Sequence, residues 1–323
     1  KGWAGSKALW KSARYVLPSS ILLIATTGLV VWAGYGFEVR SVSGLSAWPV
    51  PAATHVEIFR SLRQHYDLGH PTFAAGKLSR QGWWWYFPLA FLIKTPLPFL
   101  ILLLTTGVAL MIYEPVGRLR EAWLRYAGLW IFPLLYGIAS LFSSVNIGYR
   151  HLLPLLPVFS IAAGIGISQL HKEVRSSRIH WLNLALLALL VWQAAGTLHV
   201  GAHPLAFFNE LIGGPAKGYR YLVDSNLDWG QNLWDLKEWM TQHNEGHVNY
   251  AHYSPARPQA YGIEASYLPP DPRAKSFAPW APPPGLYAIG ATVLQGPYAP
   301  TRNTYAWFRG RSPVTRLGHA LFL

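Results

Sequence analysis

The sequence predicts a polytopic α-helical membrane protein that carries a small α/β domain at its C-terminal end. Over residues 1–200 the apolar residues gather in long runs, whereas residues 201–323 are mixed in character and rich in proline and glycine. Only 13% of the 323 residues are charged, against about 25% in an ordinary soluble domain. We therefore expect a membrane domain over residues 1–200 and a globular domain over residues 201–323.

Apolar runs close to the roughly 20 residues that a bilayer requires predict about five membrane-spanning helices. The predicted spans are Val16–Tyr35, Phe87–Tyr113, Ala127–Ser144, Leu152–Leu170 and Leu182–Val200. The fourth span contains Pro154 and Pro157, which a span tolerates when neighbouring helices satisfy the freed carbonyl groups. Residues 37–85 then form a long loop between the first two spans.

Lysine and arginine in alternate flanks set the predicted orientation, because cytoplasmic loops retain these residues. The basic residues of the three cytoplasmic flanks are Lys1, Lys7, Lys11 and Arg14, then Arg118, Arg120 and Arg125, then Lys172, Arg175 and Arg178. The loop over residues 37–85, the short loop Val145–His151 and the C-terminal domain then face outward. We expect a multi-pass protein of the cytoplasmic (inner) membrane with an extracytoplasmic C-terminal domain.

The remaining composition narrows the function classes. The formal net charge is +13, but nearly half of the basic residues flank the apolar runs, so we expect the lipid bilayer and not nucleic acid as a partner. The absence of cysteine excludes a disulfide framework, a thiolate metal site and a cysteine nucleophile. The chain begins with Lys1, so we expect it to be the C-terminal part of a longer protein.

Cationic residues at the predicted outer surface form the first candidate site. Lys94 lies in the second span about two helical turns below that surface, and Arg150 and His151 lie in the short loop before the fourth span. Together they could bind a phosphate, for which arginine offers a planar fork and lysine a point charge. The alternatives are that Lys94 snorkels to the headgroups and that Arg150 only marks a helix end. Trp84, within a run of three tryptophans, is typical of an aromatic membrane anchor.

In the C-terminal domain the pattern predicts a β-α-β unit. Its strands are predicted over Tyr219–Asp224 and Val248–Tyr253, and its helix over Gln231–Gln242. We also expect a short helix over Leu205–Ile212, further strands over Gly285–Val293 and Pro313–Leu323, and an extended proline-rich connector over Leu268–Pro284.

Asp224, Asn226 and Asp228 lie where the first predicted strand of this unit ends, a position at which ligands often bind. They could contact a sugar hydroxyl or a divalent cation, or serve only as turn and capping residues. The pairs His199/His203 and His243/His247 have helical spacing, but Pro204 and Gly246 interrupt those helices, so no metal site is predicted there.

Three stretches carry a resemblance to a known family: Gly82–Pro98, Gly148–Pro154 and Phe208–Gln231. With these motifs, in this order, the chain from about Tyr35 onward resembles bacterial membrane glycosyltransferases related to the dolichyl-phosphate-mannose protein mannosyltransferases, glycosyltransferase family 39. The resemblance implies a GT-C-like helical bundle, here partial, that transfers a sugar from a polyprenyl-phosphate donor to an acceptor at the outer face, with inversion.

The resemblance also implies roles for particular residues. Lys94 and Arg150, and more weakly His151, would contact the donor phosphate and stabilise charge as the sugar–phosphate bond breaks. Trp84 and Tyr149 join Asp224, Asn226 and Asp228 as candidate substrate or acceptor contacts. The catalytic acidic residue of the family lies in an earlier loop, expected before Lys1. Glu38, Glu57 and Asp67 match no such position.

Two other function classes stay open. A transporter or flippase of an anionic lipid or lipid-linked sugar would also need cations between helices and would show repeats and broken helices. A non-catalytic membrane scaffold would tolerate replacement of Lys94 and Arg150. No cofactor is predicted, a divalent cation is left open, and the acceptor is not specified by the sequence.

Overall fold

The computed structural model describes residues 2–44, 46–113, 127–174, 176–274, 277 and 280–323. The chain forms two compact units, residues 1–68 and 69–323, so the predicted boundary at residues 200/201 lies within the second unit. The predicted cytoplasmic loop with Arg118, Arg120 and Arg125 lies outside the described residues, as do Lys1, Arg175 and part of the proline-rich connector over 268–284.

The first unit contains one long helix, a hairpin and a second helix. These elements are α1 (Gly2–Gly34), β1 (Val39–Val42), β2 (Ser46–Pro51) and α2 (Ala53–Leu68). Within α1, Leu17–Gly34 is apolar and long enough to cross a membrane. β1 and β2 pair antiparallel. Arg40 forms ion pairs with Glu38 and Glu57 at 2.7 and 2.5 Å, so both carboxylates already have a cationic partner.

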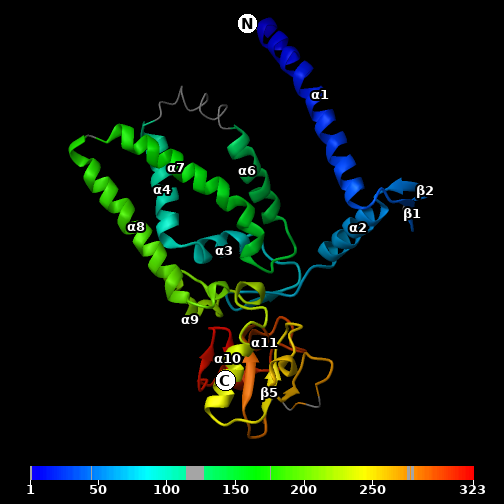
Figure 1. Cartoon of the computed structure of the whole chain (residues 1–323), viewed down its shortest axis with the longest axis vertical. Coiled ribbons are helices and arrows are strands. Elements are labelled where there is room, and N and C mark those ends of the chain that lie inside the picture. The colour runs from blue at the N-terminus through cyan, green and yellow to red at the C-terminus, as the bar shows by residue number, and fades with distance from the viewer. Residues whose placement is uncertain (1, 45, 114–126, 175, 275–276, 278–279) are drawn as a thin grey trace. The chain divides into compact units, whose positions relative to one another are not determined.

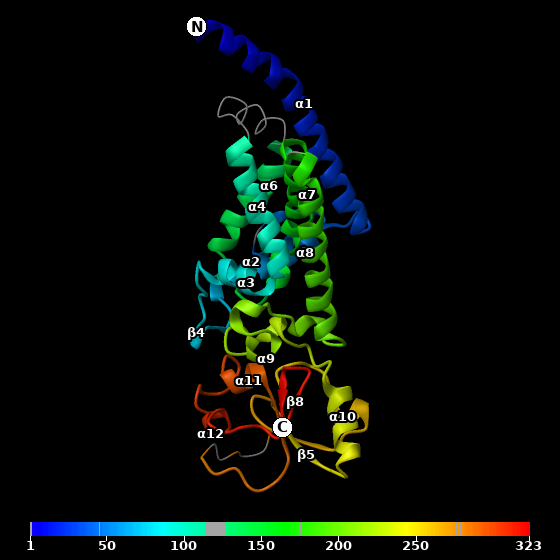
Figure 2. The same cartoon turned by 90° about the vertical axis from the view of Figure 1, so that its left-hand side faces the viewer.

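Apolar helices make up the first part of the second unit (Figures 1 and 2). They are α3 (Tyr86–Lys94), α4 (Leu97–Tyr113), α6 (Ala127–Leu141), η1 (Tyr149–Leu155), α7 (Leu156–Glu173), η2 (Ser176–Arg178) and α8 (Ile179–Val200). Two stretches, Tyr149–Glu173 and Ser176–Val200, pass the length and hydropathy test for a span, and α6 is a shorter apolar helix. With α1, the described chain has three helices that could cross a membrane, or up to four if a bent pair counts as one.

The predicted second span is broken rather than continuous. Tyr86–Lys94 and Leu97–Ala109 meet at an angle of 109°. Thr95, between them, is extended with ψ of 134°, because a residue before proline, here Pro96, is sterically excluded from the helical region. Lys94 therefore ends a short helix of its own, and the predicted second span is not one continuous helix.

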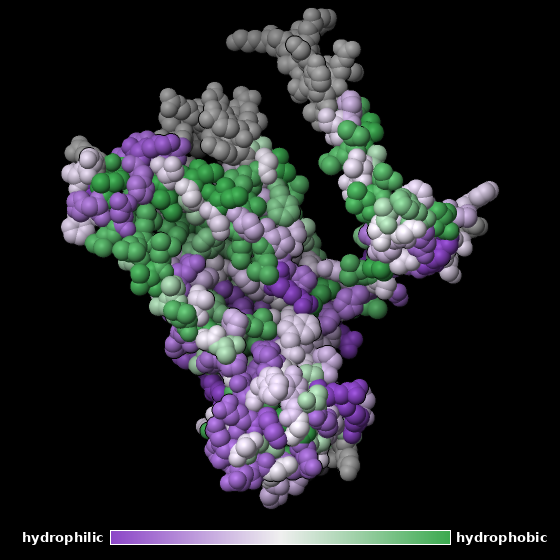
Figure 3. Space-filling model, in the orientation of Figure 1, coloured by the Kyte–Doolittle hydropathy of each residue, from purple (hydrophilic) through white to green (hydrophobic). Residues whose placement is uncertain are grey.

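Close packing joins α4 to α7. A Cβ built on Gly166 of α7 would lie 2.2 Å from the Thr106 side chain of α4, whereas one built on Gly164 would meet nothing within 4 Å. Small residues let apolar helices approach in this way. Hydrophobic residues cover much of the visible surface of these helices, and polar residues cover much of the C-terminal domain (Figure 3).

The C-terminal part of this unit is built on a five-stranded mixed sheet of order β6-β5-β7-β9-β8. Its strands are β5 (Val248–Ala251), β6 (Ala265–Tyr267), β7 (Tyr287–Gly290), β8 (Arg316–Leu317) and β9 (Leu321–Phe322). β5 pairs parallel with β6 and β7, whereas β9 pairs antiparallel with β7 and β8. The longest helix beside the sheet is α10 (Leu233–Gln242), which confirms the predicted helix.

Short elements complete this unit. They are β3 (Thr72–Ala74), β4 (Lys77–Ser79), η3 (Pro204–Ala206), η4 (Glu210–Ile212), α9 (Pro215–Gly218), η5 (Asp224–Asn226), η6 (Pro258–Tyr261), α11 (Ala291–Gln295) and α12 (Ala306–Arg309). The predicted helix over 205–212 is instead the two separate turns η3 and η4.

The predicted strand Tyr219–Asp224 is wrong. Tyr221 and Leu222 donate their backbone N–H groups to the Gly218 carbonyl at 2.9 and 3.0 Å, so the segment is a series of turns with a single bridge from Leu222 to Ala74. The expected β-α-β unit is therefore not formed, and the parallel pairs of the sheet come from β5, β6 and β7.

One hydrophobic core extends from the helices into the C-terminal sheet. Its buried members include Phe87 of α3, Leu152 of η1, Leu222 and Leu227 of the turn segment, and Ile289 of β7. Because these residues pack together, the loop after Leu222 is held between the apolar helices and the sheet.

Candidate functional site

The loop Asp224–Gly230 is the point at which the predicted motifs meet. Lys94 donates from Nζ to the Asn226 carbonyl, the Tyr149 N–H donates to Asn226 Oδ1 at 2.9 Å, and the Arg150 guanidinium carbon lies 5.1 Å from the centroid of the Trp229 ring. Residues from three distant stretches of the sequence thus contact one seven-residue loop, which we call the junction loop.

Lys94 is buried, with 7% of its surface exposed. Its Nζ donates to the Leu205 carbonyl at 2.8 Å and to that of Asn226, and it lies 4.4 Å from the centroid of the Phe208 ring. Among the ion pairs of the described residues none involves Lys94. The ammonium group therefore fastens the junction loop to η3 through carbonyl oxygens, and its predicted contact with a donor phosphate stays a prediction.

Arg150 is exposed, and its guanidinium lies over Trp229, which is itself 47% exposed. No carboxylate lies within ion-pair distance of Arg150 in the part of the chain that the structure describes. Arginine carries five N–H donors in a fixed fork, so this group can bind a phosphate without first giving up an internal ion pair.

Asp224 is the strained member of the junction loop. Its φ is 62°, in the left-handed region that a non-glycine residue seldom adopts. It is 8% exposed, and its carboxylate accepts hydrogen bonds from the Tyr298 hydroxyl and the Ser225 N–H. Its own N–H donates to Thr292 Oγ1 at 2.8 Å. Backbone strain of this kind persists where the surroundings over-determine it, and it is frequent at functional sites.

Burial raises the pKa of Asp224, and hydrogen bonds from Tyr298 and Ser225, with the charges of His70 and Arg150, oppose that rise. Burial also raises the pKa of Tyr298, and the neighbouring Asp224 raises it further. The Tyr298 hydroxyl lies 3.5 Å from both ring nitrogens of His70. An acid, a phenol and an imidazole thus adjoin the exposed cation Arg150, and a shifted acid at such a place is a candidate functional group.

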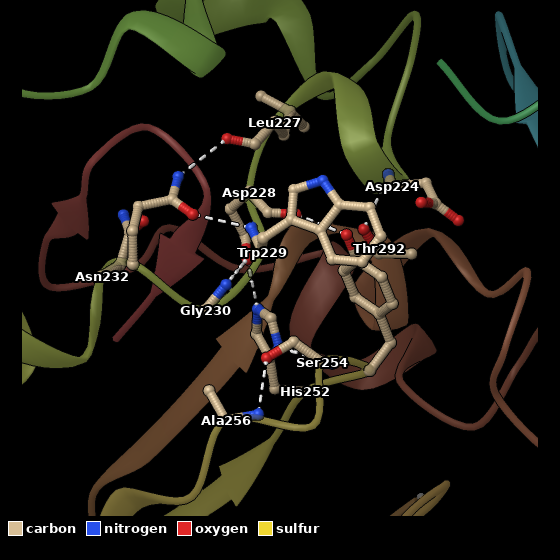
Figure 4. A network of polar contacts seen from close by, with 12 residues as sticks. Asp224, Leu227, Asp228, Trp229, Gly230, Asn232, His252, Ser254, Ala256 and Thr292 are labelled. Atoms are coloured by element: carbon tan, nitrogen blue, oxygen red, sulfur yellow. Dashed lines mark hydrogen bonds and ion pairs between the residues drawn. The ribbon is translucent and has the colours of Figure 1, made fainter. Parts of the chain in front are cut away.

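Asp228 is tied to the sheet by His252 (Figure 4). Oδ1 of Asp228 lies 2.7 Å from Nε2 of His252, and both side chains are almost fully buried. Nδ1 of His252 accepts the N–H of Ser254 at 2.9 Å, which places the ring proton on Nε2, so the histidine donates to the carboxylate. The same Oδ1 accepts the Gly230 N–H at 2.9 Å. This pair closes the C-terminal end of the junction loop onto the strand β5.

Asn226 is also saturated by internal bonds. Its amide donates to the Tyr86 hydroxyl at 3.0 Å and to the Val223 carbonyl at 2.9 Å, while its Oδ1 accepts from Tyr149. Ser225 donates to the Ile147 carbonyl. A Cβ built on Gly148 would lie 2.5 Å from Ser225 Oγ, so the segment before η1 approaches the loop closely enough to require glycine.

The other predicted residues lie around this junction. The Tyr149 hydroxyl is 2.9 Å from Thr95 Oγ1. The His151 ring packs edge-on against Phe87, and its Nε2 is buried without a hydrogen-bond partner among the described residues. Trp84 is 68% exposed, and no contact between it and the junction loop is found in the described chain.

Aromatic rings form a stack beside the loop. Tyr250, His252, Tyr253 and Tyr298 follow one another with ring centroids 5.8, 5.2 and 5.4 Å apart and nearly parallel planes. Tyr253 also donates its hydroxyl to the Asp228 carbonyl. The stack connects both acidic residues of the junction loop to β5 and to the segment after α11.

Sequence reasoning missed His70, His252, Thr292 and Tyr298. Their partners in the junction loop are distant in sequence, 74 residues for Tyr298 and 68 for Thr292, and no local pattern marks them.

For metals, no group of three His, Asp or Glu side chains that could hold an ion occurs within the described ranges. His203 instead lies 3.5 Å from Asp235.

Comparison with known proteins adds no relative. No family model, no curated protein and no solved structure matches the chain.

Proposed function

We propose that this protein transfers a sugar from a polyprenyl-phosphate donor to an acceptor at the outer face of the membrane, and that the donor phosphate binds beside the junction loop at Arg150. The observation that carries the proposal is the exposed Arg150, which has no ion pair within the described residues and lies next to the buried acid–phenol pair Asp224–Tyr298. The core residues Leu222 and Leu227 beside this point pack with the apolar helices and with the C-terminal sheet.

An apolar groove supports a lipid-linked substrate. It has a volume of about 430 Å³ and lies among α4, α7 and α8, with Ile101, Leu189 and Trp192 in its wall. Its lining is suited to an isoprenoid chain, since it offers hydrocarbon and very few polar atoms.

The reaction would proceed by displacement at the anomeric carbon. The acceptor oxygen forms the new bond to that carbon, the bond from the carbon to the phosphate oxygen breaks, and the polyprenyl phosphate leaves with the bonding electrons. The acceptor proton passes to a base. The resemblance to glycosyltransferase family 39 implies that this base is none of the residues named above. Arg150 would stabilise the charge that develops on the leaving phosphate, a contribution that grows in the transition state.

The test measures release of sugar from a set of labelled polyprenyl-phosphate sugars by the complete gene product in membranes. Arg150→Ala is compared with wild type, with Arg150→Lys, and with Arg257→Ala, which removes an exposed arginine elsewhere in the C-terminal part. A hydrogen bond to a charged group contributes about 1.5–3 kcal/mol, so Arg150→Ala should reduce kcat/KM by about 10- to 150-fold. Arg150→Lys should recover part of the loss, and Arg257→Ala should be neutral.

A transporter or flippase is the second candidate, and the 109° bend between α3 and α4 favours it, because broken helices are typical of transporters. The same membranes decide between the two. Movement of the lipid across the bilayer without consumption of any donor by wild type would refute the transferase. If Arg150→Ala, at matched protein level, consumed the donor as fully as wild type, Arg150 would not be the ligand of the donor phosphate.

A further inference from the structure

A cavity of the C-terminal part lies away from the junction loop. Its volume is about 770 Å³, and it opens between the proline-rich segment 282–284, the strands β7 and β9, and the helix α12. This volume is within the range of about 300–1,000 Å³ typical of small-molecule sites. None of the residues placed at the junction loop lines it.

Four arginines line the cavity: Arg220, Arg309, Arg311 and Arg316. No acidic side chain lines it, and the printed sequence contains no Asp or Glu after Asp271. None of the four arginines takes part in an ion pair of the described residues. The cavity therefore concentrates positive charge that no ion pair of the described residues neutralises.

Internal contacts hold these guanidinium groups in place but leave most of their donors unused. Arg309 donates to the Leu294 carbonyl at 2.8 Å, Arg316 to the Ala216 carbonyl at 2.9 Å, and Arg220 to the Tyr219 hydroxyl at 3.3 Å. Each guanidinium has five N–H donors. Such pre-positioned forks match carboxylate and phosphate groups bidentately.

Aromatic rings form a further part of the wall, beside prolines and aliphatic residues. The Arg311 guanidinium carbon lies 3.8 Å from the centroid of the Trp307 ring, and that of Arg316 lies 5.1 Å from the rings of both Tyr219 and Phe322. Ring faces in an open pocket can stack on the apolar C–H face of a sugar ring. They give nothing comparable to an inorganic ion.

We propose that this cavity binds an acidic saccharide, a sugar chain that bears carboxylate or phosphate groups, with the arginines contacting the anionic groups and the aromatic rings contacting the sugar rings. This binding does not depend on the transfer reaction proposed above, because it is carried by different residues and is measured without turnover.

Calorimetric titration of the full chain in an uncharged detergent tests the proposal. The probe is tetragalacturonic acid, and its methyl ester is the matched ligand with the same rings and no charge. Wild type should bind the acid at least about tenfold more tightly than the ester, with an affinity that falls as salt increases. Arg311→Gln should weaken binding of the acid by about tenfold, and Trp307→Ala should weaken binding of the acid and of any residual ester. Arg257→Gln should change neither.

Arg311 is exposed, so Arg311→Gln should leave the Tm unchanged, and Arg316→Gln provides a second charge variant. Equal binding of the acid and the ester would overturn the role of the arginines. Absence of binding by the acid would overturn the site. Tighter binding of tetraglutamate than of tetragalacturonate would assign the cavity to acidic peptides and overturn the saccharide.

Discussion

Replacement of His252 should destabilise the attachment of the junction loop to the sheet. In His252→Ala the buried Asp228 carboxylate keeps only the Gly230 N–H as partner at Oδ1, while its Oδ2 already has none. Breaking a buried ion pair costs about 3–5 kcal/mol, and we take the lower end, about 3 kcal/mol, because the histidine donates here as a neutral ring. At roughly 3 °C per kcal/mol for a unit of about 250 residues, Tm should fall by about 9 °C.

Tryptophan fluorescence during thermal unfolding of the detergent-solubilised protein measures this change. The matched control is His247→Ala, because His247 is exposed and makes a single hydrogen bond to Ser266 at 3.0 Å; its effect should stay within about 0.5 kcal/mol, roughly 2 °C. Asp228→Asn should cost less than His252→Ala, since the amide oxygen still accepts from the histidine. A Tm for His252→Ala within about 2 °C of wild type would refute a structural role for the pair.

Three further predictions concern packing and pH. Gly148→Ala should destabilise the protein by about 1–3 kcal/mol through overpacking, because the new Cβ would lie 2.5 Å from Ser225 Oγ; thermal unfolding should show partial recovery on adding Ser225→Ala. Gly166→Ala should likewise lower the Tm, because its Cβ would lie 2.2 Å from a threonine side chain of α4, and Gly164→Ala, with open space around it, is the control whose equal effect would contradict this. Burial raises the pKa of Asp224 above its ordinary 3.8, so the folded state binds this proton more tightly than the unfolded state and the contribution to stability is lost as pH rises above about 4. The Tm of wild type relative to that of Asp224→Asn should therefore fall between pH 4 and pH 8. A pH-independent difference would exclude the effect.

The apolar helices could be predicted from the sequence because hydropathy is a property of whole segments. Each of the predicted spans falls on helix, and three stretches pass as spans by length and composition. Hydropathy did not locate the bend between α3 and α4, since Thr95 and Pro96 interrupt the helix without changing how apolar the run is. The break could have been predicted from Pro96 itself, because a residue before proline is sterically excluded from the helical region.

The turn segment before the junction loop shows why the predicted strand failed. Residues 219–224 are rich in aromatic and branched side chains, which favour strands. Their backbone groups are instead used locally, as Tyr221 and Leu222 donate to Gly218, and their side chains enter the shared core. A buried strand and a buried series of turns both require apolar side chains, so the apolar pattern alone could not distinguish between them.

Half of the candidate site could be predicted and half could not. Lys94, Arg150 and the acidic residues of the junction loop occur in motifs that are visible along the chain. The groups that set their environment, Tyr298 and His252, are brought to the loop only by the sheet. A pairing across many residues leaves no trace in local spacing.

The two cations at the junction loop differ in a way that follows from their chemistry. A lysine ammonium is a compact point charge, and the buried Lys94 uses it to hold two backbone carbonyls. An arginine guanidinium is a planar fork, and the exposed Arg150 keeps that fork free above the Trp229 ring. Replacing Lys94 would therefore act on the position of the loop, and through the loop on Trp229, before it acted on any phosphate. Of the predicted phosphate ligands, Arg150 is the exposed one that has no ion pair among the described residues, whereas Lys94 is bonded to carbonyl groups and the unpartnered Nε2 of His151 is buried.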